Sequence, residues 1–142
     1  MRTDLVDLQS LQRSGSPNDF LACPPEFCSA RADIPGARFD LEGSKLLSIV
    51  RDVISSQPRT SIAAEDCEVG QIVAVQRSAL LRFPDTVWLQ IVPLDDESAS
   101  LVLYSRSNQG LWDLGANGRR VRKWLSAIEA AARSTSSRSR RV

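Results

Sequence analysis

The sequence has no histidine, only two lysines (Lys45 and Lys123) and no apolar run near the roughly 18–20 residues that cross a bilayer as a helix. Without histidine there is no histidine base, no Ser-His-Asp or Cys-His catalysis and no imidazole metal site. Asp4 and Asp7 lie near the start and no apolar segment follows, which does not fit a secretory signal. As written, the sequence predicts a cytoplasmic protein. An upstream start codon that restored an export signal would instead place it in the envelope or periplasm.

What is present is the composition of a globular protein, with 142 residues that are 42% hydrophobic and 25% charged. The net charge of +1 hides an asymmetry, because residues 1–110 hold 10 basic and 15 acidic side chains while residues 111–142 hold 8 basic and 2 acidic. A basic end can bind phosphate on nucleic acid or lipid headgroups, but it equally suits a solvated helix face followed by a frayed tail. Residues 71–107 combine few aromatics with few arginines and an acidic turn, which argues against nucleic acid as a partner.

Three cysteines are present, at positions 23, 28 and 67. Cys-x4-Cys plus one distant cysteine is a poor match to zinc spacings, so we predict no metal and no cofactor. Cys23 and Cys28 could close a small disulfide loop in an oxidising compartment, whereas cytoplasmic thiols would stay reduced. Cys67 is left free in either case, and we expect it to be a small apolar side chain in or beside a strand.

The amino-terminal part of the chain predicts little regular structure before residue 43. Residues 1–17 are expected to form a flexible leader, and the prolines that follow predict an extended loop over residues 19–36. A helix is expected over residues 43–57, because its apolar residues repeat with a period of 3.6. Ser44 is its expected N-cap, and Pro58 ends it.

The rest of the chain predicts strands and one closing helix. A short strand is expected within residues 60–68, and longer ones over residues 71–81, 87–92 and 101–107, joined by short turns as an antiparallel meander. A helix follows over residues 117–133, and residues 134–142 are expected to be a disordered basic tail. The fold class predicted is therefore α+β, with a two-layer arrangement in which one antiparallel sheet packs against two helices. Residues 18–133 form the single domain, and no internal repeat is visible.

Three stretches of sequence together resemble a known family, the bacterial and plastid domain of unknown function 1499. The stretches are Cys23–Ser29, Ser78–Trp88 and Tyr104–Val121, and the resemblance covers roughly residues 18–128. Gly118, Leu111 and Trp112 depart from the family pattern, and the export signal or lipid anchor of many relatives is not seen here. Because the family has no assigned activity, the resemblance implies a fold unit and no reaction.

Polar residues gather where the last strand passes into the closing helix, and they form the candidate site. A strand end, a glycine-bounded loop and a first helical turn together offer backbone N–H groups, hydroxyls and guanidinium groups, which suit a carboxylate or phosphate. The same residues could instead hold the loops in register, with Arg106 paired to Asp85 or Asp113, Asp113 capping the turn, and Asn117 as the helix N-cap. The candidate anion site consists of Arg82, Asp85, Ser105, Arg106, Ser107, Asp113, Asn117 and Arg120.

The function that we predict is that of a small non-enzymatic binding or accessory domain, whose ligand is an anionic small molecule or the acidic group of a partner. One alternative is a hydrolase that uses the carboxylates of Asp85 and Asp113, since without histidine the base must be one of these acids or one of the two lysines. Another is a membrane-peripheral accessory protein, held by Trp112 and the basic tail. Of the other tryptophans, Trp124 is expected in the core and Trp88 on the second sheet face or in solvent.

Overall fold

The computed structural model describes residues 4–13, 15, 17–108 and 113–140. Within these residues, one sheet of seven strands has the order β2-β1-β7-β6-β5-β4, and β3 pairs with β7 beside this path. All pairs are antiparallel except β1 with β2, and two helices complete the fold, which confirms the predicted α+β class. The strands are β1 (Asp19–Cys23), β2 (Ile34–Pro35), β3 (Arg38–Phe39), β4 (Thr60–Asp66), β5 (Gln71–Arg77), β6 (Pro84–Asp95) and β7 (Ser98–Ser107).

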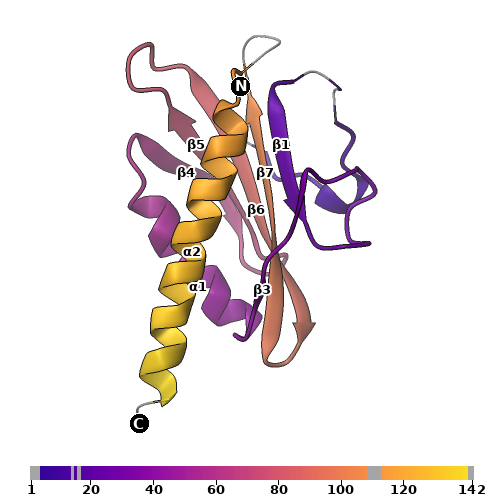
Figure 1. Ribbon diagram of the computed structural model, residues 1–142, viewed down its shortest axis with the longest axis vertical. Helices are drawn as coiled ribbons and strands as arrows, with labels where there is room; N and C mark the ends of the chain where they lie inside the picture. Colours follow the sequence, from indigo (N-terminus) through magenta and orange to yellow (C-terminus); the bar gives the residue numbers. More distant parts are fainter. Residues whose placement is uncertain (1–3, 14, 16, 109–112, 141–142) are drawn as a thin grey trace.

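The hairpin of β6 and β7 is the centre of the sheet, and its two strands are longer than the sequence predicts (Figure 1). Its register runs from Asp95 opposite Ser98 at the turn to Asp85 opposite Ser107 at the open end. The sequence predicts a strand over residues 87–92 with turns on either side, whereas the paired residues of β6 extend beyond this range at both ends. Strand β5, in contrast, ends at Arg77 and leaves residues 78–83 as a loop.

Both helices bury their apolar stripes in a single core (Figure 1). Helix α1 (Gly43–Ser55) contributes residues such as Leu46 and Val50, and helix α2 (Ala116–Arg140) contributes Val121, Trp124 and Ile128. The placement of Trp124 in the core agrees with the sequence prediction. Ser44 is not the N-cap, because α1 already begins at Gly43 and Glu42 is its N-cap residue.

Helix α2 continues to Arg140, although the sequence predicts a helix end near Arg133 and a disordered tail beyond it. No glycine or proline interrupts residues 134–140.

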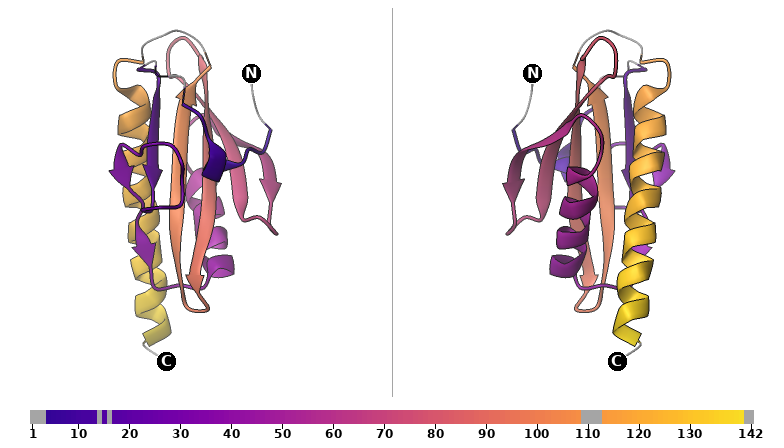
Figure 2. Two further views of the ribbon diagram at one scale, coloured as in Figure 1. Left: turned by 90° about the vertical axis from the view of Figure 1, so that its right-hand side faces the viewer. Right: turned by 90° about the vertical axis from the view of Figure 1, so that its left-hand side faces the viewer.

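The second face of the sheet is covered by the amino-terminal segment, which the sequence predicts to be a flexible leader (Figure 2). Leu8, in the short 3-10 helix η1 (Leu8–Ser10), is fully buried against Trp88 and Tyr104. Gln71 accepts from the backbone N–H of Val6 at 2.9 Å and donates to its carbonyl at 2.7 Å. The segment is held here because β5, β6 and β7 are apolar on both faces, so the second face also needs cover.

Residues 19–36 are not only an extended loop, since they include strands β1 and β2. Between them, Cys23 and Cys28 are joined by a disulfide, and Cys28 packs into the second-face core. Cys67 is free, as expected, but it is exposed rather than an apolar part of the packing, because it lies in the turn after β4. The prediction of an extended loop was wrong for β1. Alternate residues of this strand pack into the two cores, but the strand is too short for that alternation to be recognised among the prolines.

Candidate functional site

The first turn of α2 is organised by Asp113, which lies just before the helix. Its Oδ1 accepts from the backbone N–H of Gly115 at 2.7 Å, and its Oδ2 accepts from the backbone N–H of Asn117 at 3.2 Å. Free N–H groups at the start of a helix need such acceptors. Asp113 therefore supplies the capping carboxylate, and Asn117, which was expected to be the N-cap, lies inside the helix.

Asn117 is completely buried and is the centre of the polar junction between β7 and α2. Its Oδ1 accepts from the hydroxyl of Ser105 at 2.5 Å. Its Nδ2 lies within donating distance of the Asn18 carbonyl at 2.9 Å, the Ser107 hydroxyl at 2.9 Å and the Asp113 carboxylate at 2.7 Å. One side chain thus ties the end of β7, the residue before β1 and the cap of α2 together.

Arg120 lies one turn further along α2 and fills the space between the helix and the sheet. Its Nη2 forms an ion pair with Asp85 at 2.9 Å, and the two side chains are only 11% and 14% exposed. Its Nε donates to Gln76 at 2.5 Å, while its Nη1 lies 2.8 Å from Asn117 Oδ1 and 3.1 Å from Ser105 Oγ. Each nitrogen of the guanidinium group therefore already has an acceptor within the chain.

Burial raises the pKa of Asp85 above the usual value for aspartate. The positive charge and hydrogen bond of Arg120 oppose this shift, as does a hydrogen bond from Ser107, while the negative charge of Asp113 adds to it. Burial therefore raises the free energy of the ionised Asp85 carboxylate, and Arg120 is the group that stabilises its negative charge.

The structure brings six of the eight candidate residues together and leaves two arginines outside. Arg106 alternates with Ser105 and Ser107 along β7, so it belongs to the opposite face of the sheet from Arg120. Arg82 lies in the exposed β5–β6 loop. The expected pairing of Arg106 with Asp85 or Asp113 is wrong, because Arg120 is the cation that α2 places over Asp85.

Two members of the junction were not foreseen from the sequence, Gln76 on β5 and Asn18 before β1. Their partners lie 44 and 99 residues away along the chain, and no local pattern marks such contacts. Gly118, which departs from the family pattern, lies where α2 packs against β1. A Cβ atom there would come within 3.1 Å of the Phe20 ring, so glycine lets α2 approach β1 closely.

A second polar cluster lies on the other face, beside the leader. Arg13 forms ion pairs of 2.8 Å with both Asp19 and Asp33, and these charges raise its pKa against the effect of burial. Tyr104 donates to Asp19 at 2.7 Å, and burial raises the pKa of this tyrosine. These contacts fasten the leader to β1 and β7.

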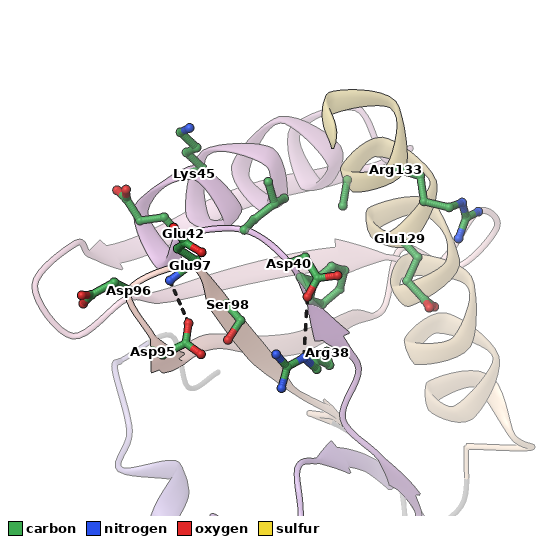
Figure 3. A pocket seen from close by; sticks show the side chains of 13 residues that line it. Arg38, Asp40, Glu42, Lys45, Asp95, Asp96, Glu97, Ser98, Glu129 and Arg133 are labelled. Carbon is green, nitrogen blue, oxygen red and sulfur yellow. Dashed lines mark hydrogen bonds and ion pairs between the residues drawn. The ribbon is translucent and has the colours of Figure 1, made fainter. Parts of the chain in front are cut away.

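A groove lies beside the β6–β7 turn (Figure 3), at the other end of the hairpin from the junction. This groove has a volume of about 1090 Å³ and is bordered by the β6–β7 turn, the start of α1 and the middle of α2. Its rim is rich in carboxylates, but in the described residues no group of acids and cysteines is arranged to hold a metal ion. The charged residues along it are Arg38, Asp40, Glu42, Lys45, Asp95, Asp96, Glu97, Glu129 and Arg133.

Taken together, the mostly antiparallel sheet, the two helices and the buried junction define a small α+β protein. A family model described as Protein of unknown function (DUF1499) matches residues 12–128, and the chain belongs to that family. No curated protein and no solved structure matches it. Neither helix, as far as the chain is described, is both long and apolar enough to cross a membrane.

Proposed function

We propose that this chain is a non-catalytic binding domain, and that the junction of β6, β7 and α2 is a brace rather than a ligand site. The observation that supports a brace is the Arg120–Asp85 ion pair, in which both side chains are largely buried. A free arginine would attract an external anion, but here the chain's own carboxylate takes that place. The brace links the ends of β5, β6 and β7 to the start of α2.

The hydrolase alternative has less support from this geometry. A general base must reach its substrate, and the carboxylate of Asp85 faces a buried arginine. Asp113 is occupied by the backbone of the first turn of α2 and by Asn117. Neither carboxylate is left to activate a water molecule.

The brace and the anion site can be distinguished by thermal unfolding with inorganic phosphate, acetate or succinate added. For a brace, Arg120→Gln lowers the melting temperature, and none of the anions raises that of the wild type beyond the general effect of salt. Arg119→Gln is the matched control, because Arg119 is exposed on the same turn and, among the described residues, donates to the carbonyl of Leu114. A saturable rise with one anion in the wild type, absent from Arg120→Gln, would overturn the proposal.

A further inference from the structure

The β5–β6 loop carries three exposed apolar side chains, one of which is the most exposed large apolar side chain of the described chain. Leu80 is 88% exposed, Leu81 64% and Phe83 49%, and all three lie within four consecutive residues. Single exposed leucines are ordinary on protein surfaces, whereas neighbouring ones often indicate a binding surface. We call residues 77–83 the apolar tip.

The backbone of the apolar tip is closed by its own hydrogen bonds. The N–H of Ser78 donates to the carbonyl of Phe83 at 3.0 Å, and the N–H of Phe83 donates back to the Ser78 hydroxyl at 3.0 Å. Arg77 donates to the carbonyl of Arg82 at 3.1 Å, and Arg82 adopts a left-handed φ of 60° that turns the chain. The leucines are therefore presented by a formed loop.

The charges around the apolar tip are positive. Arg77 and Arg82 flank the two leucines, both are exposed, and neither forms an ion pair with any described residue. The carboxylates nearest along the strands and loops, Asp85 and Asp113, are occupied within the junction. The start of α2 lies at the same end of the sheet as this loop (Figures 1 and 2), and Leu114, which is 65% exposed, comes just before that helix.

The opposite end of the β6–β7 hairpin carries negative charge. Its turn carries Asp95, Asp96 and Glu97 on the rim of the acidic groove (Figure 3). Twelve residues of β6 separate the two ends, about 36 Å at the usual rise of a strand. A negatively charged surface would therefore attract the apolar tip and repel the other end of the hairpin.

We propose that the apolar tip docks on an anionic lipid bilayer, with Leu80 and Leu81 entering the headgroup region and Arg77 and Arg82 lying at the level of the phosphates. A projecting loop with leucines between two arginines suits a fluid interface, where apolar side chains insert and guanidinium groups stay with the phosphates. The inference rests on the proposed binding function and names the partner. The brace keeps the tip in position.

Vesicle flotation tests this assignment, with phosphatidylcholine vesicles compared with vesicles that also contain about 30% phosphatidylglycerol. The wild type should bind only the anionic vesicles, and less tightly as salt is added. The double variant Leu80→Ser, Leu81→Ser should bind at least about tenfold more weakly. Val69→Ser, Leu94→Ser is the control, because these two apolar residues are also exposed (54% and 47%) but lie away from the tip.

The arginines are tested separately. Arg82→Asn removes the charge while keeping a residue that tolerates the left-handed conformation, and it should weaken binding to anionic vesicles about fivefold. Arg38→Gln, at the other end of the sheet, should leave binding unchanged. A variant with glutamine at Arg138, Arg140 and Arg141 measures the basic C-terminal segment, which begins about 33 Å along α2 from Ala116, and should also keep its binding.

Three outcomes would overturn the lipid assignment. They are a wild type that ignores anionic vesicles, a leucine variant that binds as well as the wild type, and loss of binding only in the C-terminal variant. If the leucine variant instead turns a dimer into a monomer in light scattering, the tip is a contact between copies. None of these results alters the unfolding of Arg120→Gln, so failure of the lipid assignment is distinct from failure of the brace.

Discussion

Asn117 shows how much of the junction depends on one side chain. Its carbonyl oxygen accepts from Ser105 and Arg120, and its amide nitrogen has three acceptors on three segments of the chain. All of these contacts lie in or beside the core, where polar groups without partners are costly. No other residue type offers a neutral donor and acceptor in this shape.

Replacing Asn117 by alanine is expected to lower the free energy of unfolding by about 2–4 kcal/mol, because several partners lose a hydrogen bond at once. Ser126→Ala is the control on the same helix, since Ser126 is exposed, and it should change stability by less than about 0.5 kcal/mol. Urea unfolding measures both. Equal, small losses for the two variants would show that the network contributes little to stability.

The Arg120–Asp85 pair predicts a dependence on pH with a definite sign. The pKa of Asp85 is already above 3.8 in the folded protein, and removing Arg120 raises it further, because the opposing positive charge is lost. Below both pKa values Asp85 is neutral and needs no cation. As the pH rises through the folded pKa of Asp85, the carboxylate ionises. In the wild type Arg120 stabilises this buried charge, whereas in the variant no cation does.

Arg120→Gln should therefore be more destabilising at pH 7 than near pH 3.8, with a loss of about 3–5 kcal/mol at pH 7. Unfolding in urea across this pH range measures the difference between variant and wild type. A loss that stays constant over the range would mean that Asp85 does not titrate in contact with Arg120. Arg119→Gln should show a small loss with no such slope.

At the level of elements, the Cys23–Cys28 disulfide closes a six-residue loop whose residues also contact the leader. Phe27, within the loop, packs in the same second-face core as Leu8, and Ser29, directly after the loop, donates to the carbonyl of Gln9 at 2.8 Å. The disulfide thus stabilises one of the surfaces that hold the leader against β6 and β7. The loop is short, so its closure entropy is modest.

The protein as described should expose one reactive thiol per chain, that of Cys67, and three after reduction and unfolding. Replacing Cys23 and Cys28 by alanine should lower the free energy of unfolding by about 2 kcal/mol, from the chain entropy of a six-residue loop. Thiol titration and urea unfolding measure the two effects. Three reactive thiols in the native protein would contradict the disulfide and favour a reducing compartment.

At the scale of the whole molecule, the sequence predicts the α+β class and the existence of both helices, because their apolar stripes are long and regular. It locates β5, β6 and β7 but not their ends, since pairing register decides where a strand stops. It does not show that the leader covers the second face, because Leu8 meets Trp88 only after the sheet has formed. Six of the candidate residues do meet, but the cation that joins them is Arg120 and not Arg106.

The strands β5, β6 and β7 place alternate residues into both cores, so the two faces should unfold together. Leu8→Ala in the leader is expected to cost about 2–4 kcal/mol and Ile128→Val in α2 about 1 kcal/mol, since both side chains are fully buried. The two losses should add to within about 0.5 kcal/mol, because the residues lie on opposite faces of the sheet. Far-ultraviolet circular dichroism and tryptophan fluorescence should give the same midpoint for each variant. If Leu8→Ala shifts only the fluorescence midpoint, the leader detaches on its own and the two faces are not one cooperative unit.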